Sequence, residues 1–306
     1  MKQKINDSLS LAIILVNWNS YELTKRCLLS LKKVSYSHAR IYLVDNGSKD
    51  GSGAKLREEF SGLTFIQNQE NLGFTGGNNI AINQALFDGN ELIMLLNNDT
   101  EVKHDFIEPL VKRLNDNAGL AAVQPLILDL NDRQKIWNAG GDFNRFFGLA
   151  KTRLEGKGIE SLTDFNPNTG WITGCCVLTR SSVLSEIGNL NNKFFAYHED
   201  VDWSIRMIKA GYSLGIVYES VIYHLSMATL RSDTKGKEGF LSPFMHYLHV
   251  RNHLYLIRIH LDFFNRFGIW LYQSYKFCGY MTYFLLRLRF TKLKSAYRGF
   301  KDGLTK

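Results

Sequence analysis

The sequence has no uncharged run of the roughly 18 to 20 residues that a membrane-spanning helix needs. Its longest apolar stretch, residues 277–286, is bounded by Lys276 and Arg287, which favours lying on a bilayer over crossing it. The amino terminus has lysines followed by an apolar run, but this run leads into Asn17-Trp18-Asn19 without a small-residue cleavage site. We therefore expect a first strand there and no secretory signal.

Cysteine is scarce, with 4 residues in 306. Cys175 and Cys176 are adjacent, and no pair has the C-x-x-C spacing of a zinc or redox site. We therefore expect no disulfide framework and a reducing, cytoplasmic setting. Internal repeats and low-complexity tracts are absent as well. The length and the hydrophobic content of 45% suffice for one large domain with an appendage, or for two modest domains.

Negative charge is nearly missing from residues 244–306, which hold 11 of the 37 Lys and Arg but only 2 of the 29 Asp and Glu. The same region holds 16 of the aromatic residues. We expect a main domain at 1–243 and a basic, aromatic-rich helical region at 244–306. This composition predicts contact with an anionic membrane surface or with nucleic acid. The alternatives are a helical pair packed on the main domain and a contact with a second copy of the chain.

Apolar runs alternate with helical patterns along the main domain. Strands are predicted at 11–16, 41–44, 63–66 and 91–96, with helices at 20–31 and 76–87. This alternation predicts a mostly parallel α/β sheet. The pattern weakens over 129–168, which we interpret as a surface segment. Regular structure is expected again as a strand at 171–179, helices at 181–187 and 199–210, and short strands at 214–218 and 221–223.

Polar clusters follow three of the predicted strands, at 17–19, 45–48 and 97–99. Each cluster alone is also typical of a tight turn. Ligands of parallel sheets bind beyond the carboxyl ends of the strands, so we expect the three clusters to meet at one crevice.

A fourth polar cluster, His198-Glu199-Asp200-Val201-Asp202-Trp203, precedes a predicted helix, and a strand further along ends at His224. A carboxylate that takes a proton from a hydroxyl, beside a divalent cation, would suit the transfer of an activated sugar. The alternative is an acidic first turn that offsets the helix dipole.

These motifs stand in a fixed order that resembles one known family. The series is Val16-Asn17-Trp18-Asn19, Val44-Asp45-Asn46-Gly47-Ser48, Asn71-Leu72-Gly73-Phe74, Gly76-Gly77-Asn78-Asn79, Leu96-Asn97-Asn98-Asp99, Thr173-Gly174 and Glu199-Asp200-Val201-Asp202. Over about residues 10–260 it resembles the family 2 glycosyltransferases, especially their bacterial rhamnosyltransferase-like branch. The resemblance implies a GT-A fold, a Rossmann-like α/β sheet flanked by helices, with a carboxy-terminal helical extension here.

The resemblance also implies an inverting, metal-dependent transfer of a sugar from a nucleoside diphosphate. Asp200 matches the catalytic base of the family. The DxD metal motif matches Asn97-Asn98-Asp99, so that Asp99 is its one carboxylate, and this departure allows weaker metal binding. With His224, Asp99 is expected to hold Mn²⁺ or Mg²⁺.

The remaining predicted site residues are of two kinds. The donor nucleotide is expected at Asn17, Asn19, Asp45, Asn46, Gly73, Gly77, Asn78, Asn97 and Asn98. The acceptor or the sugar is expected at Trp171, Thr173, Gly174, Glu199, Asp202 and Arg251. Arg251 is predicted to meet a lipid-linked diphosphate.

The favoured function is therefore a non-processive glycosyltransferase of cell-surface polysaccharide synthesis, such as that of O-antigen. We favour dTDP-rhamnose as the donor, with a UDP-sugar next, and a saccharide or polyprenyl-diphosphate-linked saccharide as the acceptor. The multiple spans and the Gln-x-x-Arg-Trp motif of processive synthases are absent, which predicts single additions. We expect a peripheral enzyme at the inner face of the cell membrane, a homodimer as one alternative, and no nucleic acid partner.

Two other classes remain as alternatives. One is a membrane-surface module that still binds nucleotide sugars but whose catalytic site has decayed, as the Asn97-Asn98 departure suggests. The other is a sugar nucleotidyltransferase, although its glycine- and arginine-rich first loop is missing after Val16. A nicotinamide dehydrogenase is disfavoured because no G-x-G-x-x-G follows the first strand.

Overall fold

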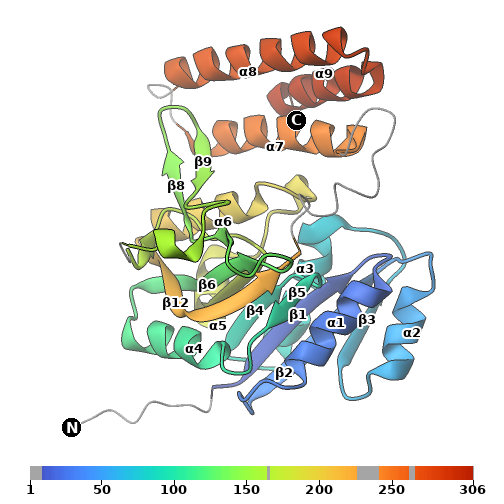
Figure 1. The fold of residues 1–306 in the computed structure, drawn as a ribbon, viewed down its shortest axis with the longest axis vertical. Coiled ribbons are helices and arrows are strands. Elements are labelled where there is room, and N and C mark those ends of the chain that lie inside the picture. The colour runs from blue at the N-terminus through green and yellow to red at the C-terminus, as the bar shows by residue number, and fades with distance from the viewer. Residues whose placement is uncertain (1–8, 164–165, 226–240, 262–265, 306) are drawn as a thin grey trace.

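The computed structural model describes residues 9–163, 166–225, 241–261 and 266–305. One large sheet with helices on both faces forms the lower part, and three carboxy-terminal helices lie above it (Figure 1). The strand order along the sheet is β10-β12-β6-β11-β4-β1-β2-β3.

Six long strands of this sheet run in one direction. They are β1 (Leu11–Asn17), β2 (Ala39–Asn46), β3 (Thr64–Asn68), β4 (Leu92–Leu96), β6 (Leu120–Asp129) and β12 (Ser213–His224). Between β4 and β6, β11 (Cys176–Arg180) is antiparallel to both. The carboxyl ends of the six strands and the amino end of β11 therefore meet at the same edge of the sheet.

The two sides of the sheet bury alternate residues of each strand, as the two-residue period of a strand requires. Leu11, Ile13 and Leu15 pack on one side with the helices α1 and α4, whereas Ala12 and Ile14 pack on the other with α3, α5 and α6. The helices are α1 (Tyr21–Leu31), α2 (Ser52–Glu59), α3 (Gly73–Phe87), α4 (Ile107–Asp116), α5 (Ser181–Ile187) and α6 (Glu199–Lys209).

The shorter strands either pair with strands of this sheet or form a separate hairpin. They are β5 (Thr100–Val102) and β10 (Asn168–Thr169) on β12, β7 (Ile136–Asn138) on β6, and the separate hairpin of β8 (Gly141–Asn144) and β9 (Leu149–Thr152). The segment 129–168, expected to lie on the surface, thus contains this hairpin, which projects towards the carboxy-terminal helices (Figure 1).

Three predicted elements differ most clearly from those observed. The strand predicted at 171–179 covers only 176–180. The helix predicted from residue 76 begins at Gly73, whose φ of +73° is open to glycine at little cost. The two strands expected at 214–218 and 221–223 are one strand, β12, with a register shift between Val217 and Val221.

The carboxy-terminal region consists of α7 (Pro243–His260), α8 (Arg266–Leu286) and α9 (Phe290–Thr305) in its described residues. Gly299 lets α9 approach α7, because a Cβ there would lie 2.6 Å from the carbonyl oxygen of Tyr247. A small core of Val250, Leu254, Phe284 and Ala296 joins the three helices. None of the described helices is both long and apolar enough to span a bilayer.

Candidate active site

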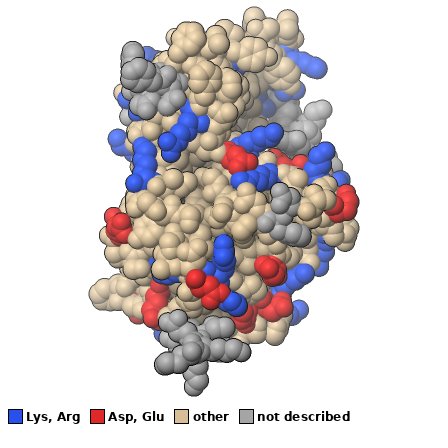
Figure 2. Space-filling model, turned by 90° about the vertical axis from the view of Figure 1, so that its left-hand side faces the viewer, with Lys and Arg blue, Asp and Glu red and all other residues tan. Residues whose placement is uncertain are grey.

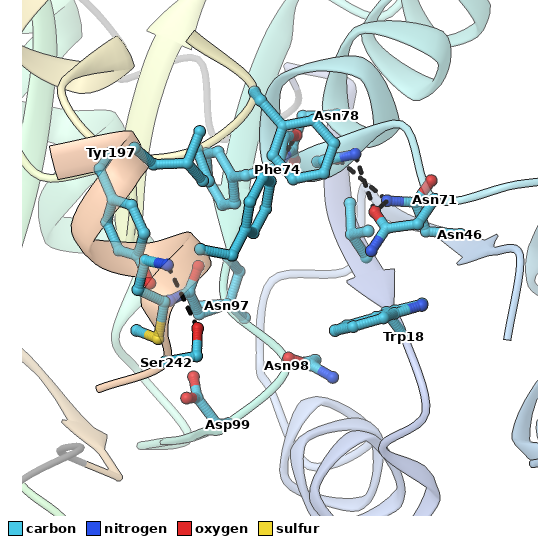
Figure 3. Close-up of a pocket in the computed structure, with 18 residues that line it drawn as sticks. Trp18, Asn46, Asn71, Phe74, Asn78, Asn97, Asn98, Asp99, Tyr197 and Ser242 are labelled. Carbon is cyan, nitrogen blue, oxygen red and sulfur yellow. Dashed lines mark hydrogen bonds between the residues drawn. The ribbon is translucent and has the colours of Figure 1, made fainter. Parts of the chain in front are cut away.

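A cavity of about 440 Å³ opens at the carboxyl edge of the sheet. Its wall brings together residues from the ends of β1, β2 and β4, the start of α3, the loop 195–197 and the start of α7 (Figure 3). The lining residues are Val16, Trp18, Asn46, Asn71, Gly73, Phe74, Asn78, Leu96, Asn97, Asn98, Asp99, Phe195, Ala196, Tyr197, Ser242, Phe244, Met245 and Leu248. All three polar clusters that were expected to meet therefore contribute to one cavity.

Asn17 and Asp45 lie beneath this cavity and are not among its lining residues. The amide nitrogen of Asn17 donates to Asp45 Oδ1 at 2.8 Å, and Gln67 Nε2 donates to Asp45 Oδ2 at 2.6 Å. Asn19 joins the same network, since its Oδ1 accepts from the backbone N–H of Lys49. In this arrangement the buried pair holds together the turns that follow β1 and β2, and the donor contacts predicted for it stay predictions.

The amino end of α3 faces the cavity because Gly77 lets it approach the sheet. A Cβ at Gly77 would lie 2.9 Å from Val16 and 3.2 Å from the amide nitrogen of Asn46. The amide nitrogen of Asn46 donates a hydrogen bond to the carbonyl oxygen of Gly73 at 3.0 Å. The backbone N–H groups of Gly73 and Thr75 in this first turn already donate to Asn71 Oδ1 and to the carbonyl oxygen of Phe195, so the donor contacts predicted for this end of α3 stay predictions.

Asp99 and His224 end two different strands and come together. His224 Nε2 lies 3.2 Å from Asp99 Oδ1. That oxygen and His224 Nδ1 are buried and have no hydrogen-bond partner among the described residues. A buried polar atom without a hydrogen-bond partner lowers the stability of the fold. A bound cation would remove this penalty at the Asp99 carboxylate.

The pair fits an oxygen-preferring cation only in part. Among the residues that the structure describes, no group of three His, Cys, Asp or Glu side chains could hold a metal ion. A cation here would take Asp99 and His224 as its protein ligands, and the donor diphosphate would supply further oxygens, as is common for Mg²⁺.

Asp200 lies in the first turn of α6 and is not among the residues that line the cavity. Its Oδ2 accepts from the backbone N–H of Gly174 at 3.1 Å, and its Oδ1 accepts from that of Val201 at 2.8 Å. Burial raises the pKa of Asp200, and these two hydrogen bonds partly oppose the shift. Gly174 also touches Phe74 of the cavity wall, since a Cβ there would lie 3.1 Å from that ring.

The charges of Asp99 and Asp200 both act on one buried thiol. The pKa of Cys175 is raised well above its ordinary value, first by burial and then by the negative charges of Asp99 and Asp200. The candidate metal ligand and the candidate base are therefore close to the same residue. Neighbouring Glu199 has a pKa raised well above its usual range by burial and by the Asp200 charge.

A sequence profile of glycosyl transferase family 2 matches residues 12–188, more than half of the chain. The chain belongs to glycosyl transferase family 2. The predicted family is thus confirmed, and the chain is a nucleotide-sugar glycosyltransferase of an inverting family.

Two curated relatives of this family 2 enzyme are rhamnosyltransferases. The N-acetylglucosaminyl-diphospho-decaprenol L-rhamnosyltransferase of Mycobacterium tuberculosis (strain H37Rv) is 24% identical over 243 residues, which cover 72% of this chain and 78% of the relative. Rhamnosyltransferase WbbL of Escherichia coli (strain K12) is 27% identical over 217 residues, which cover 67% of this chain and 79% of that protein.

A solved structure supports the fold of the family 2 enzyme. GalNAc-T7 with UDP, GalNAc and Mn²⁺ matches with a TM-score of 0.64 at 17% identity, over 82% of this chain and 48% of that one. This chain therefore spans about half of that structure, and the likeness concerns the fold alone. The predicted GT-A α/β fold is confirmed.

Within the family 2 fold, the residues predicted for the acceptor lie apart from the cavity lining. Asp202 accepts from Arg206 Nε at 3.0 Å and from His260 Nε2 at 2.7 Å, so it fastens α7 to α6. Trp171 is 8% exposed and belongs to a core cluster. The backbone N–H of Thr173 donates to Gln124 Oε1.

Arg251 also makes hydrogen bonds within the protein in this structure. Its Nη2 donates to the carbonyl oxygens of Lys193 and Phe194, each at 2.8 Å. Its predicted contact with a lipid-linked diphosphate stays a prediction, because no observed contact bears on it.

Sequence reasoning missed Asn252, which is fully buried. Its amide nitrogen donates to the carbonyl oxygens of Phe194, Ala196 and Tyr197 at 2.7–2.9 Å. Phe195, Tyr197 and His198 have φ values of +65°, +72° and +70°, which non-glycine residues rarely adopt. Asn252 thus holds the strained loop that lines the cavity and leads into Asp200. No sequence signal separated Asn252 from the four histidines and two arginines of the same helix.

Proposed function

We propose that this glycosyltransferase moves rhamnose from dTDP-rhamnose to a hydroxyl group of a saccharide acceptor. The observation that carries the proposal is the position of Asp200, a carboxylate of raised pKa near the Asp99 and His224 pair and behind the wall of the cavity. The two rhamnosyltransferases among the relatives support the choice of sugar, and a UDP-sugar is the next candidate.

In the proposed reaction, Asp200 takes the proton of the acceptor hydroxyl. The freed oxygen forms a bond to the anomeric carbon while the bond from that carbon to the diphosphate oxygen breaks on the opposite face, so the configuration inverts. A carboxylate with a raised pKa is a stronger base, and the N–H groups of Gly174 and Val201 keep it aimed.

Asp99 and His224 would hold Mn²⁺ or Mg²⁺, which supplies positive charge that stabilises the leaving diphosphate. Asn97 and Asn98 lie on the same turn and line the cavity, but neither carries a charge. One carboxylate of this turn would therefore hold the cation, and we expect its affinity to be weak.

The proposed acceptor is a polyprenyl-diphosphate-linked saccharide or another saccharide of a cell-surface polysaccharide, extended by single additions. The M. tuberculosis relative is named for a lipid-linked acceptor of this type. Such an acceptor would place the enzyme at the inner, cytoplasmic face of the cell membrane.

The test is the release of nucleoside diphosphate from thymidine, uridine and guanosine diphosphate sugars, with Mn²⁺, Mg²⁺ or a chelator. The panel includes a lipid-linked N-acetylglucosamine acceptor. The proposal predicts release from dTDP-rhamnose that needs both metal and acceptor. Turnover of a different nucleotide sugar alone would overturn the donor assignment, and full turnover in chelator would overturn the role of the cation.

A further inference from the structure

The described side chains on the outer side of α8, from residue 267 to 286, are uncharged. Its exposed positions between residues 267 and 286 are Phe267, Trp270, Leu271, Ser274, Tyr275, Cys278, Gly279, Thr282, Tyr283, Leu285 and Leu286. Most of these follow a spacing of three or four residues and therefore form one stripe, which is roughly 30 Å long at the rise of an α-helix.

The largest side chains of this α8 stripe stand well out into solvent. Phe267, Tyr275 and Leu286 are each 77% exposed, and Leu271 is 64% exposed. Lys276 points the other way, since its Nζ lies 3.1 Å from His253 Nδ1, and burial lowers its pKa to about 8. A contiguous apolar patch of this kind marks an interaction site.

The α8 helix is held firmly against the main domain by the tip of the β8–β9 hairpin. Phe147 lies 6.0 Å from Tyr272 between ring centroids. Gly268 packs against Phe146 so closely that a Cβ there would lie within 3 Å of the ring. The stripe is therefore a surface of the folded enzyme.

Positive charge lies at the carboxyl end of the stripe and on the helix that follows it. Arg289 Nη1 donates to the hydroxyl group of Tyr283 in the stripe at 3.2 Å. The exposed cations of the turn after α8 and of α9 are Arg287, Lys294, Arg298 and Lys301. Asp302 is the one acidic residue that the structure describes from 241 to 305, and it is 7% exposed and accepts from the Tyr247 hydroxyl. Figure 2 shows Lys and Arg but no Asp or Glu on the face of the carboxy-terminal helices at the top.

We propose that the α8 stripe lies in the interface of an anionic lipid bilayer, with the cations of the turn after α8 and of α9 on the lipid head groups. Trp and Tyr suit the boundary between head groups and acyl chains, and Lys and Arg add attraction to anionic lipid. The inference rests on the proposed function only for the membrane that carries the acceptor. We propose lipid as the occupant because the cations near the stripe have no exposed carboxylates among them in the described residues. A protein partner or a second copy of the chain would not require this.

The test is sedimentation of the full chain with vesicles of phosphatidylcholine, with or without about a third of phosphatidylserine. The variant is Phe267→Ser with Leu271→Ser. Its matched control is Leu29→Ser with Phe87→Ser, which removes the same two residue types from exposed positions on α1 and α3. We expect the wild type and the control to bind the anionic vesicles, and the α8 variant to bind about tenfold less tightly or worse.

Three outcomes would overturn the inference. They are a wild type that stays in the supernatant with both vesicles, equal binding by the two double variants, and a wild-type dimer that the α8 variant dissociates. The α8 variant is expected to keep wild-type release of nucleoside diphosphate with a water-soluble acceptor. Failure of the membrane surface is thereby distinguished from failure of the proposed transfer.

Discussion

At the scale of single residues, Asp200 and Glu199 are adjacent carboxyl groups with different environments. Asp200 accepts two backbone N–H groups, whereas Glu199 Oε2 is buried without a hydrogen-bond partner among the described residues. Burial raises the pKa of both, and the charge of Asp200 raises that of Glu199 further. The two environments therefore favour an ionised Asp200 beside a neutral Glu199.

We predict that Glu199→Gln stabilises the fold above about pH 5 and has little effect near pH 4. The folded state binds the Glu199 proton more tightly than the unfolded state, so its contribution to stability is present below the ordinary pKa of 4.5 and is lost as pH rises towards the raised pKa. A tenfold difference in proton affinity between the two states corresponds to about 1.4 kcal/mol. Thermal unfolding from pH 4 to 8 measures the effect, with exposed Glu58→Gln as the control. A pH-independent difference would contradict it.

We predict opposite effects for two substitutions in the turn after β4. Asp99→Asn removes one of two protein ligands and should raise the Mn²⁺ concentration needed for donor binding by about tenfold or more. Asn97→Asp adds a carboxylate to the cavity wall and should lower that concentration. Calorimetry of nucleoside diphosphate binding across a Mn²⁺ series gives both values. The metal assignment fails if both variants follow the wild-type curve.

The sequence could predict which residues gather at the site better than what each one does there. Asn17 and Asp45 do come together, because parallel neighbouring strands end at one edge. Their side chains are nevertheless occupied by hydrogen bonds to each other and to the adjoining turns. Asp202 likewise binds His260, which lies 58 residues later in the chain. Pairings at such a separation depend on how helices dock, and no local pattern encodes them.

At the scale of elements, the site depends on where strands end and where α6 begins. Strands with continuous apolar runs, such as β1 and β4, were predicted closely, because burial on both faces leaves a clear pattern. We made no prediction for α4 and β6. In the structure, β6 pairs with β12 from more than 90 residues later, and local periodicity gives no sign of such a distant partner.

We predict that Asn252→Ala lowers the free energy of unfolding by about 2–4 kcal/mol, because it removes the side-chain donor of the Ala196 and Tyr197 carbonyl groups, whereas that of Phe194 keeps Arg251. It should also lower kcat more than it raises KM for the donor, since the loop 194–197 leads into Asp200. Chemical denaturation and steady-state kinetics below the unfolding transition measure the two effects.

The matched control for Asn252→Ala is Asn83→Ala, which removes an exposed amide that pairs with Asn189 at the surface. Equal loss of stability in the two variants would contradict the role of Asn252 in holding the loop 194–197. A loss of stability with unchanged kcat would leave Asn252 a purely structural residue.

At the scale of the whole molecule, the carboxy-terminal helices complete the site. Ser242, Phe244, Met245 and Leu248 line the cavity, so a division at residue 243 would cut through its wall. Composition alone indicated that 244–306 differs from the rest, and the structure adds that α7 closes the cavity while α8 faces outward. One chain therefore carries both a polar cavity and an apolar outer helix.

The central claim is that Asp200 removes the proton of the acceptor hydroxyl. The most direct test compares Asp200→Asn with the wild type in donor affinity by calorimetry and in turnover. The account predicts near wild-type donor affinity and a turnover reduced by about a thousandfold, since the amide keeps the shape of the carboxyl group but accepts no proton. A matching loss of donor affinity, or turnover within about tenfold of the wild type, would contradict it.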